Sequence, residues 1–239
     1  MKIHPYRGHA LKCLGRQANL VIFATACLIG ICPASVRSQT DPINSQTDVR
    51  ETNERMRKGW NEFGVWGGVS FQAPRLIGKT PNARFGNIGL RYGRVLAASK
   101  TVALEYTIDA VPVALLSTKR LTLSPLSPGV FSVTESRQST YAAGLSPIGF
   151  KLNFRRLKKV QVFTSTTGGF LYFRDQVPLS GAALFNFTFD LAGGVQIVKS
   201  NRRAILIGYR YQHISNGFTS PINPGVDVQM VFAGFSIFR

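Results

Sequence analysis

Residues 185–197 of the chain read FNFTFDLAGGVQI, and they show the pattern that indicates the fold most clearly. Three phenylalanines and Leu191 occupy every second position, and polar residues stand between them. A period of two places successive side chains on opposite faces, which is typical of a β-strand and not of a helix. The stretch therefore predicts a strand with one apolar face and one polar face.

The same alternation recurs seven more times after Asn61. The runs lie at residues 63–71, 88–96, 102–110, 148–154, 160–173, 205–212 and 226–238. The connections alternate in length. The short ones are 97–100, 155–159 and 199–203. The long ones are 72–86, 116–138, 174–182 and 217–225. An even number of strands, with short turns at one end and long loops at the other, predicts an all-β, eight-stranded antiparallel outer-membrane barrel over residues 61–239.

Two soluble folds also alternate in this way. A sandwich uses shorter strands and has similar loops at both ends. A lipocalin-like barrel places its apolar face inside, and its outer face here would carry few charges beyond those at 105, 109, 190 and 210. The membrane barrel is therefore favoured, with the polar face turned inward.

The predicted interior contains charges of both signs. Eight strands enclose a space that side chains just fill, which argues against a water-filled pore. We expect a structural ion network there, in preference to a proton pathway. Its expected members are Arg91, Lys151 and Arg210 with Glu105, Asp109 and Asp190.

The first 38 residues have the order of a cleaved secretory signal peptide. Four basic residues precede an apolar run at 20–31, and small residues lead to Val36-Arg37-Ser38. A membrane anchor would need a longer run, and a lipoprotein site at Cys27 would need a large aliphatic residue where Ala24 stands. We predict a signal peptide at 1–38, a polar arm at 39–60, and secretion to the bacterial outer membrane.

The amino-acid composition excludes several classes of protein and of functional site. The 239 residues are 44% hydrophobic, which argues against disorder. Cleavage near Ser38 would remove all three cysteines, which excludes disulfide scaffolds, cysteine metal sites and cysteine nucleophiles. It would also remove five basic residues and no acidic one, lowering the net charge from +18 to +13.

The remaining basic excess lies partly in the long loops. Its members there are Arg75, Lys79, Arg84, Lys119, Arg120, Arg137 and Arg174. These basic side chains either attract the phosphates of lipopolysaccharide or are charges on the loops that water solvates. Nucleic acid is not an expected partner, because basic residues are divided among turns at both ends.

His213 is the single histidine left after cleavage, and Ser215 follows it. Residues two apart on a strand share a face, and this pair continues the apolar face of Ile205 and Ile207. The pair would therefore meet lipid at the outer end of its strand, an unusual place for polar groups without a function. A serine hydroxyl becomes a nucleophile when a nearby base takes its proton, and an imidazole is such a base. The alternative is a hydrogen-bonded pair at a loop end.

Asp227 is the candidate third member, because hairpin pairing would bring the next strand beside His213. If Val231 and Phe235 face lipid, Asp227 shares the face of His213. If the opposite parity faces lipid, Asp227 points inward and the pair acts as a dyad. Asn216 and backbone N–H groups near Gly217 are candidates to hold an oxyanion.

Residues 209–217, YRYQHISNG, and residues 223–227, NPGVD, resemble the PagL-type lipid A deacylase (acyloxyacyl hydrolase) family. The close resemblance covers about residues 205–238. Members of that family are eight-stranded outer-membrane barrels that hydrolyse the ester-linked acyl chain at position 3 of lipid A. The resemblance implies that His213 is the base and Ser215 the nucleophile, and that Asn216 holds the oxyanion or positions the substrate. It implies no metal and no cofactor.

Two features depart from the family pattern. The family's acid, commonly Glu, falls at Asp227, whose side chain is one methylene shorter. The chain ends in Arg239 with Phe238 penultimate, whereas many outer-membrane barrels end in an aromatic residue.

The expected function is that of an outer-membrane serine esterase acting on lipid A within lipopolysaccharide, through an acyl-enzyme at Ser215. A non-catalytic structural or adhesive barrel is the first alternative. An esterase acting on another envelope lipid, such as a phospholipase, is the second.

Overall fold

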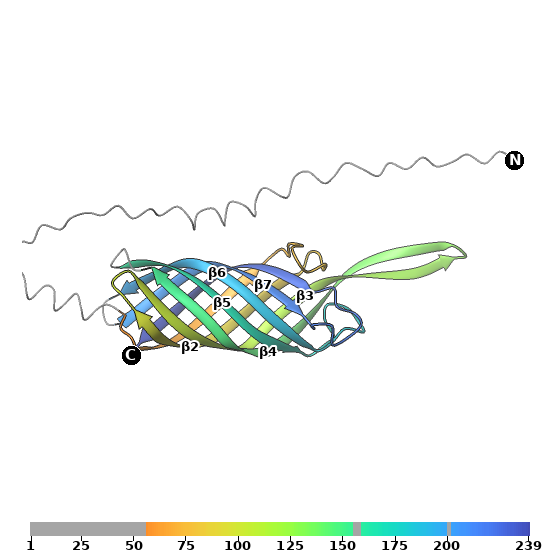
Figure 1. Ribbon diagram of the computed structural model, residues 1–239. Helices are drawn as coiled ribbons and strands as arrows, with labels where there is room; N and C mark the ends of the chain where they lie inside the picture. The colour runs from red at the N-terminus through yellow and green to blue at the C-terminus, as the bar shows by residue number, and fades with distance from the viewer. Residues whose placement is uncertain (1–55, 155–158, 200–201) are drawn as a thin grey trace, which may run out of the picture. The chain divides into compact units, whose positions relative to one another are not determined.

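The protein forms one closed barrel of eight antiparallel strands, in which each strand pairs with its neighbours in sequence and β1 pairs with β8 (Figure 1). The computed structural model describes residues 56–154, 159–199 and 202–239, so the predicted signal peptide and most of the polar arm lie outside them. The strands are β1 (Asn61–Ser70), β2 (Arg84–Ala98), β3 (Val102–Ser127), β4 (Val130–Phe154), β5 (Val160–Phe173), β6 (Phe185–Lys199), β7 (Arg203–Ser215) and β8 (Val226–Phe238). The predicted fold class is confirmed. No helix in the described ranges is long and apolar enough to cross a membrane.

The two ends of the barrel differ. One end of the barrel holds the short connections and also the residues with which the barrel sequence begins and finishes, Asn61 and Arg239. These two residues exchange two backbone hydrogen bonds. The other end, called the rim below, holds the loops after β1, β5 and β7 and the junction of β3 with β4. This is the asymmetry expected from the connection lengths, with long loops on the outer side of an outer-membrane barrel.

The predicted loop at 116–138 is wrong. β3 and β4 instead continue as a two-stranded ribbon, drawn in pale green in Figure 1, which projects past the rim and turns at Gly129. Cross-strand pairs such as Leu123 opposite Val133 hold the ribbon together. Gly129 has a φ of +82°, a conformation that glycine adopts without steric cost.

The wall of the barrel is apolar outside and polar inside. On β6, Phe187, Phe189 and Leu191 are about half exposed, at 48%, 46% and 51%, and the polar residues between them are buried. A soluble barrel would have the reverse arrangement, so the lipocalin-like alternative is excluded and the outer face suits lipid.

The interior contains the expected ion pairs. Arg91 donates two hydrogen bonds to Asp109 at 2.7 and 2.6 Å, and Arg210 lies 3.8 Å from Asp190. Lys151 lies 3.5 Å from Glu105 and also 3.0 Å from Glu62, which the sequence analysis did not include. Buried apolar clusters lie toward both ends, with Met230 in the one near the rim and Phe238 in the one near the short turns. The interior is therefore filled by side chains.

Candidate active site

His213 and Ser215 project from the outer wall where β7 reaches the rim, as the alternation predicted. Ile214 between them is 1% exposed and belongs to the interior, so its neighbours on the strand point outward. The His213 side chain is 19% exposed. A polar pair thus lies on an outer wall that carries exposed apolar side chains such as Phe187 and Val231 at this end.

Asp227 pairs directly with His213 in the register of β7 and β8. Its Oδ1 lies 2.7 Å from Nδ1 of His213. Val228 and Met230 are buried inside whereas Val231 is exposed, so Asp227 shares the outward parity of His213. The first alternative therefore holds. Because the two residues are directly opposite, the shorter aspartate side chain reaches the imidazole.

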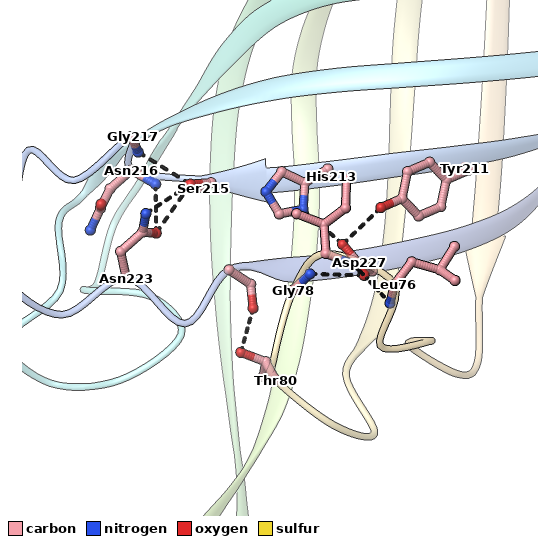
Figure 2. A network of polar contacts seen from close by, with 12 residues as sticks. Leu76, Gly78, Thr80, Tyr211, His213, Ser215, Asn216, Gly217, Asn223 and Asp227 are labelled. Atoms are coloured by element: carbon pink, nitrogen blue, oxygen red, sulfur yellow. Dashed lines mark hydrogen bonds and ion pairs between the residues drawn. The ribbon is translucent and has the colours of Figure 1, made fainter. Parts of the chain in front are cut away.

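The loop after β1 closes over Asp227, which is 0% exposed. Its backbone N–H groups at Leu76, Ile77 and Gly78 donate to Oδ2 of Asp227 at 2.7, 2.8 and 2.9 Å. The hydroxyl of Tyr211 donates to Oδ1 at 3.0 Å. Figure 2 shows the loop folded against the start of β8. Peptide dipoles, and no lysine or arginine, thus compensate the carboxylate within the described part of the chain.

Two glycines permit this close approach. A Cβ atom on Gly78 would lie 2.9 Å from the backbone nitrogen of Asp227 and 3.0 Å from its Oδ1. A Cβ atom on Gly225 would lie 3.0 Å from Cε1 of His213. Thr80 adds two hydrogen bonds to the carbonyl of Gly225, at 2.7 Å from its hydroxyl and 3.3 Å from its N–H. The loop and the start of β8 form one packed unit beside the imidazole.

The hydroxyl of Ser215 is turned toward the loop after β7. Its Oγ lies 3.1 Å from Oδ1 and 3.0 Å from Nδ2 of Asn223, and it accepts a hydrogen bond from the N–H of Gly217 at 3.2 Å. Within the described atoms it makes no hydrogen bond to His213 (Figure 2). Two N–H donors therefore already converge on this oxygen.

Asn216 is 1% exposed, and its side chain is engaged within the loop after β7. Its Nδ2 donates to the carbonyl of Ile222 at 2.9 Å, and its Oδ1 accepts from the N–H of Phe218 at 2.9 Å. Its own N–H donates to Oδ1 of Asn223 at 3.2 Å. Asn216 thus shapes the loop that presents Gly217 and Asn223 to Ser215.

Three of these groups were not among the residues predicted from the sequence. Asn223 lies in the segment 223–227 that resembles the family, and Tyr211 lies on the same face of its strand as His213. Each of these features was a signal that could have identified the residue. The segment 76–78 had none, because it acts through backbone N–H groups and lies 149 to 151 residues from Asp227.

Exposed apolar side chains lie close to the polar cluster. Leu76, Ile77, Phe187 and Phe218 are all largely exposed near it. Such a surface accommodates a hydrocarbon chain beside a polar reacting group.

A sequence model of the family described as lipid A 3-O-deacylase (PagL) matches residues 100–236, which include His213, Ser215 and Asp227 but not the segment 76–78. No protein of curated function matches by sequence.

Among solved structures, the outer membrane enzyme PagL is 14% identical, with 72% of this chain and 97% of that chain covered and a TM-score of 0.52. Neisserial surface protein A is 12% identical over 75% and 99% of the two chains, with a TM-score of 0.45. The attachment invasion locus protein Ail of Yersinia pestis is 12% identical over 76% and 99%, with a TM-score of 0.39. The first of these likenesses shows a shared barrel fold.

Proposed function

The chain belongs to the lipid A 3-O-deacylase (PagL) family of outer-membrane enzymes, and on this premise we propose that it is a serine esterase that hydrolyses an ester-linked acyl chain of lipid A. The observation that carries the proposal is the 2.7 Å contact between His213 and Asp227 on the lipid-facing wall, with Ser215 on the same face. An interior triad would be shielded from lipid, whereas this one meets the leaflet in which acyl esters lie.

The roles follow from the hydrogen bonds. Asp227 accepts the Nδ1 proton of His213, which leaves Nε2 as the basic nitrogen. Ser215 turns from Asn223 to Nε2, gives up its proton, and its Oγ attacks the ester carbonyl carbon. The N–H of Gly217 and Nδ2 of Asn223, which now contact Oγ, hold the oxyanion that forms beside it.

The reaction is completed by the same groups. His213 donates the proton to the departing sugar oxygen, which breaks the ester bond and leaves the acyl chain on Ser215. A water molecule then gives its proton to His213 and attacks the acyl-enzyme, and the fatty acid leaves as Ser215 recovers its proton. Asp227 stabilises the imidazolium formed in each half of the cycle.

The proposed domain organisation matches this function. A signal peptide at 1–38 directs export and is cleaved, an arm covers 39–60, and the barrel at 61–239 inserts in the outer membrane. The rim then faces the exterior, where lipopolysaccharide forms the outer leaflet.

Mass spectrometry of lipid A tests the proposal. Purified barrel incubated with lipopolysaccharide should remove the mass of one ester-linked acyl chain, and Ser215→Ala should leave the lipid intact while still folding. Ser139→Ala, on the outer face of β4 away from the site, is the matched control and should retain full activity. Unchanged lipid A with the wild-type protein would refute the proposal, and preferential release of fatty acid from phospholipid would support the phospholipase alternative.

A further inference from the structure

A polar cleft of about 330 Å³ lies on the rim, between the base of the β3–β4 ribbon and the loop joining β5 to β6. None of its lining residues contributes to the cluster around His213. Those relevant to binding are Arg120, Gln138, Arg174, Asp175, Gln176 and Ser180. A volume near 300 Å³ is the lower end of the range for small-molecule sites, enough for about one substituted sugar.

The cleft presents hydrogen-bond donors. The two guanidinium groups form no ion pair among the described residues, and Arg174 lies over the ring of Tyr141 at 5.6 Å. The single carboxylate, of Asp175, accepts a hydrogen bond from Thr140 at 2.8 Å. Guanidinium, amide and hydroxyl groups together complement a ligand that carries negative oxygen atoms.

Neighbouring cations on the ribbon are already engaged. Lys119 lies 2.5 Å from Glu135, and Arg137 donates to the carbonyls of Asn82 and Ser117 at 2.9 and 3.2 Å. Their cross-strand pairing places them together on one face of the ribbon, whereas Arg120 belongs to the other face. Of the three ribbon cations, Arg120 is therefore the one whose side chain makes neither an ion pair nor a hydrogen bond within the described residues, and it lines the cleft.

The cleft is linked to the candidate active site by two touching loops. Ser180 lines the cleft, and the carbonyl of the next residue, Gly181, accepts a hydrogen bond from Ser220 at 2.7 Å. Ser220 lies in the loop that also carries Asn223, the partner of Ser215. A ligand with its lipid end at Ser215 and its sugar end across the rim would meet both.

We propose that this cleft binds a phosphate- or carboxylate-bearing sugar of the lipopolysaccharide core. The inference rests on the proposed function, since lipid A as the substrate brings the attached core sugars to the rim. The cleft would recognise the part of the substrate that extends away from the membrane, while the outer wall handles the acyl ester.

A binding measurement tests the cleft without catalysis. The probe is core oligosaccharide released from lipid A by mild acid, titrated calorimetrically into the full barrel in neutral detergent. We expect saturable binding that weakens about tenfold or more in Arg120→Gln and in Arg174→Gln, because each loses charge-assisted hydrogen bonds. Lys119→Gln removes the same charge one residue away on the opposite face, and it should bind like the wild type. Equal weakening in Lys119→Gln would overturn the proposal, and so would unchanged binding in both arginine variants.

Two further probes define the ligand. Oligosaccharide that has been dephosphorylated and carboxyl-reduced should lose most of its affinity. Inorganic phosphate should compete only at concentrations far above those of the oligosaccharide. Undiminished binding of the neutral sugar, or competition by phosphate at equal concentration, would contradict recognition of an anionic sugar.

Kinetics separate this inference from the proposed function. In Arg120→Gln the KM for complete lipopolysaccharide should rise about tenfold, whereas kcat and the KM for core-free lipid A should stay unchanged. An equal rise for both substrates would overturn the inference. If the wild-type protein hydrolyses neither substrate, the proposed function fails, and the calorimetric result still decides whether the cleft binds core sugar.

Discussion

Buried carboxylates occur both inside the barrel and on its outer wall, and they are compensated differently. Inside, Asp109 lies against Arg91, whereas Glu62 and Glu105 share Lys151, so these carboxylates are compensated by cationic side chains. On the outer wall, Asp227 faces three peptide N–H groups, one phenol and an imidazole. The interior carboxylates face cationic side chains, whereas the outer carboxylate orients an imidazole on the lipid-facing wall.

The interior ion pairs are therefore suited to stabilising the barrel, whereas the outer cluster is suited to chemistry. An arginine–aspartate pair in a filled interior has no route to substrate. A histidine that is oriented by a fully buried carboxylate and is itself 19% exposed has such a route. Substitutions in the two regions should therefore affect different measurements.

The largest effect on activity is expected for the pair on β7. His213→Asn should reduce turnover by about a thousandfold or more, because the hydroxyl of Ser215 then has no base. The double variant with Ser215→Ala should be no worse than the worse single variant, since the two act as one unit. Rates of acyl release from lipid A measure this, with heat-modifiable gel mobility as the folding control. Additive losses would show that the residues act separately.

The second-largest effect on activity is expected at Asp227. Asp227→Asn keeps the size of the side chain, removes its charge and favours the wrong imidazole tautomer, so kcat should fall about a hundredfold. Asp227→Glu restores the charge but adds a methylene in a fully enclosed site, and its rate should fall between those of the wild type and Asp227→Asn. Wild-type turnover in a folded Asp227→Asn protein would make this residue a strand-start residue only.

The loop after β1 should have a moderate effect. Gly78→Ala places a Cβ atom within 3.0 Å of Asp227, so the loop must shift and its N–H groups move away from the carboxylate. We expect kcat to fall by about tenfold with little change in KM, because orientation is lost and binding surface is retained. Gly86→Ala is the control, since its Cβ would meet only ordinary contacts at 3.6 Å and beyond. Equal losses of kcat in Gly78→Ala and Gly86→Ala would show that the loop after β1 does not contribute to catalysis.

The smallest effect on activity, and a large one on stability, is expected inside the barrel. Arg91→Met leaves Asp109 without its cation, which costs about 3–5 kcal/mol when a buried pair is broken. The temperature of heat-induced gel mobility change should fall, while turnover per folded molecule stays at the wild-type value. Asp109→Asn in addition should restore part of the stability. A loss of turnover in the folded Arg91→Met protein would mean that the interior is linked to the site.

The alternation in the sequence was enough to assign the two faces of the wall and the face on which His213 and Ser215 lie. Alternation is a local property, because the pleat of a strand alone sends residues i and i+2 to one face. His213 and Ser215 could therefore be placed outward from their parity with Ile205 and Ile207. The interior location of Arg91 and Asp109 followed in the same way. The ribbon was missed although Leu121 and Leu123 alternate with polar residues and continue β3 through residues expected to be a loop.

The groups that contact these residues depend on the tertiary structure. The position of Asp227 depends on the register between β7 and β8, and a shift of one residue would have turned it inward. Its hydrogen bonds to Leu76 and Gly78 join residues 151 and 149 positions apart, and they use backbone groups that every residue type except proline possesses. The order of side chains in the sequence does not predict such a contact, because it forms only when the barrel closes and the loop packs against β8.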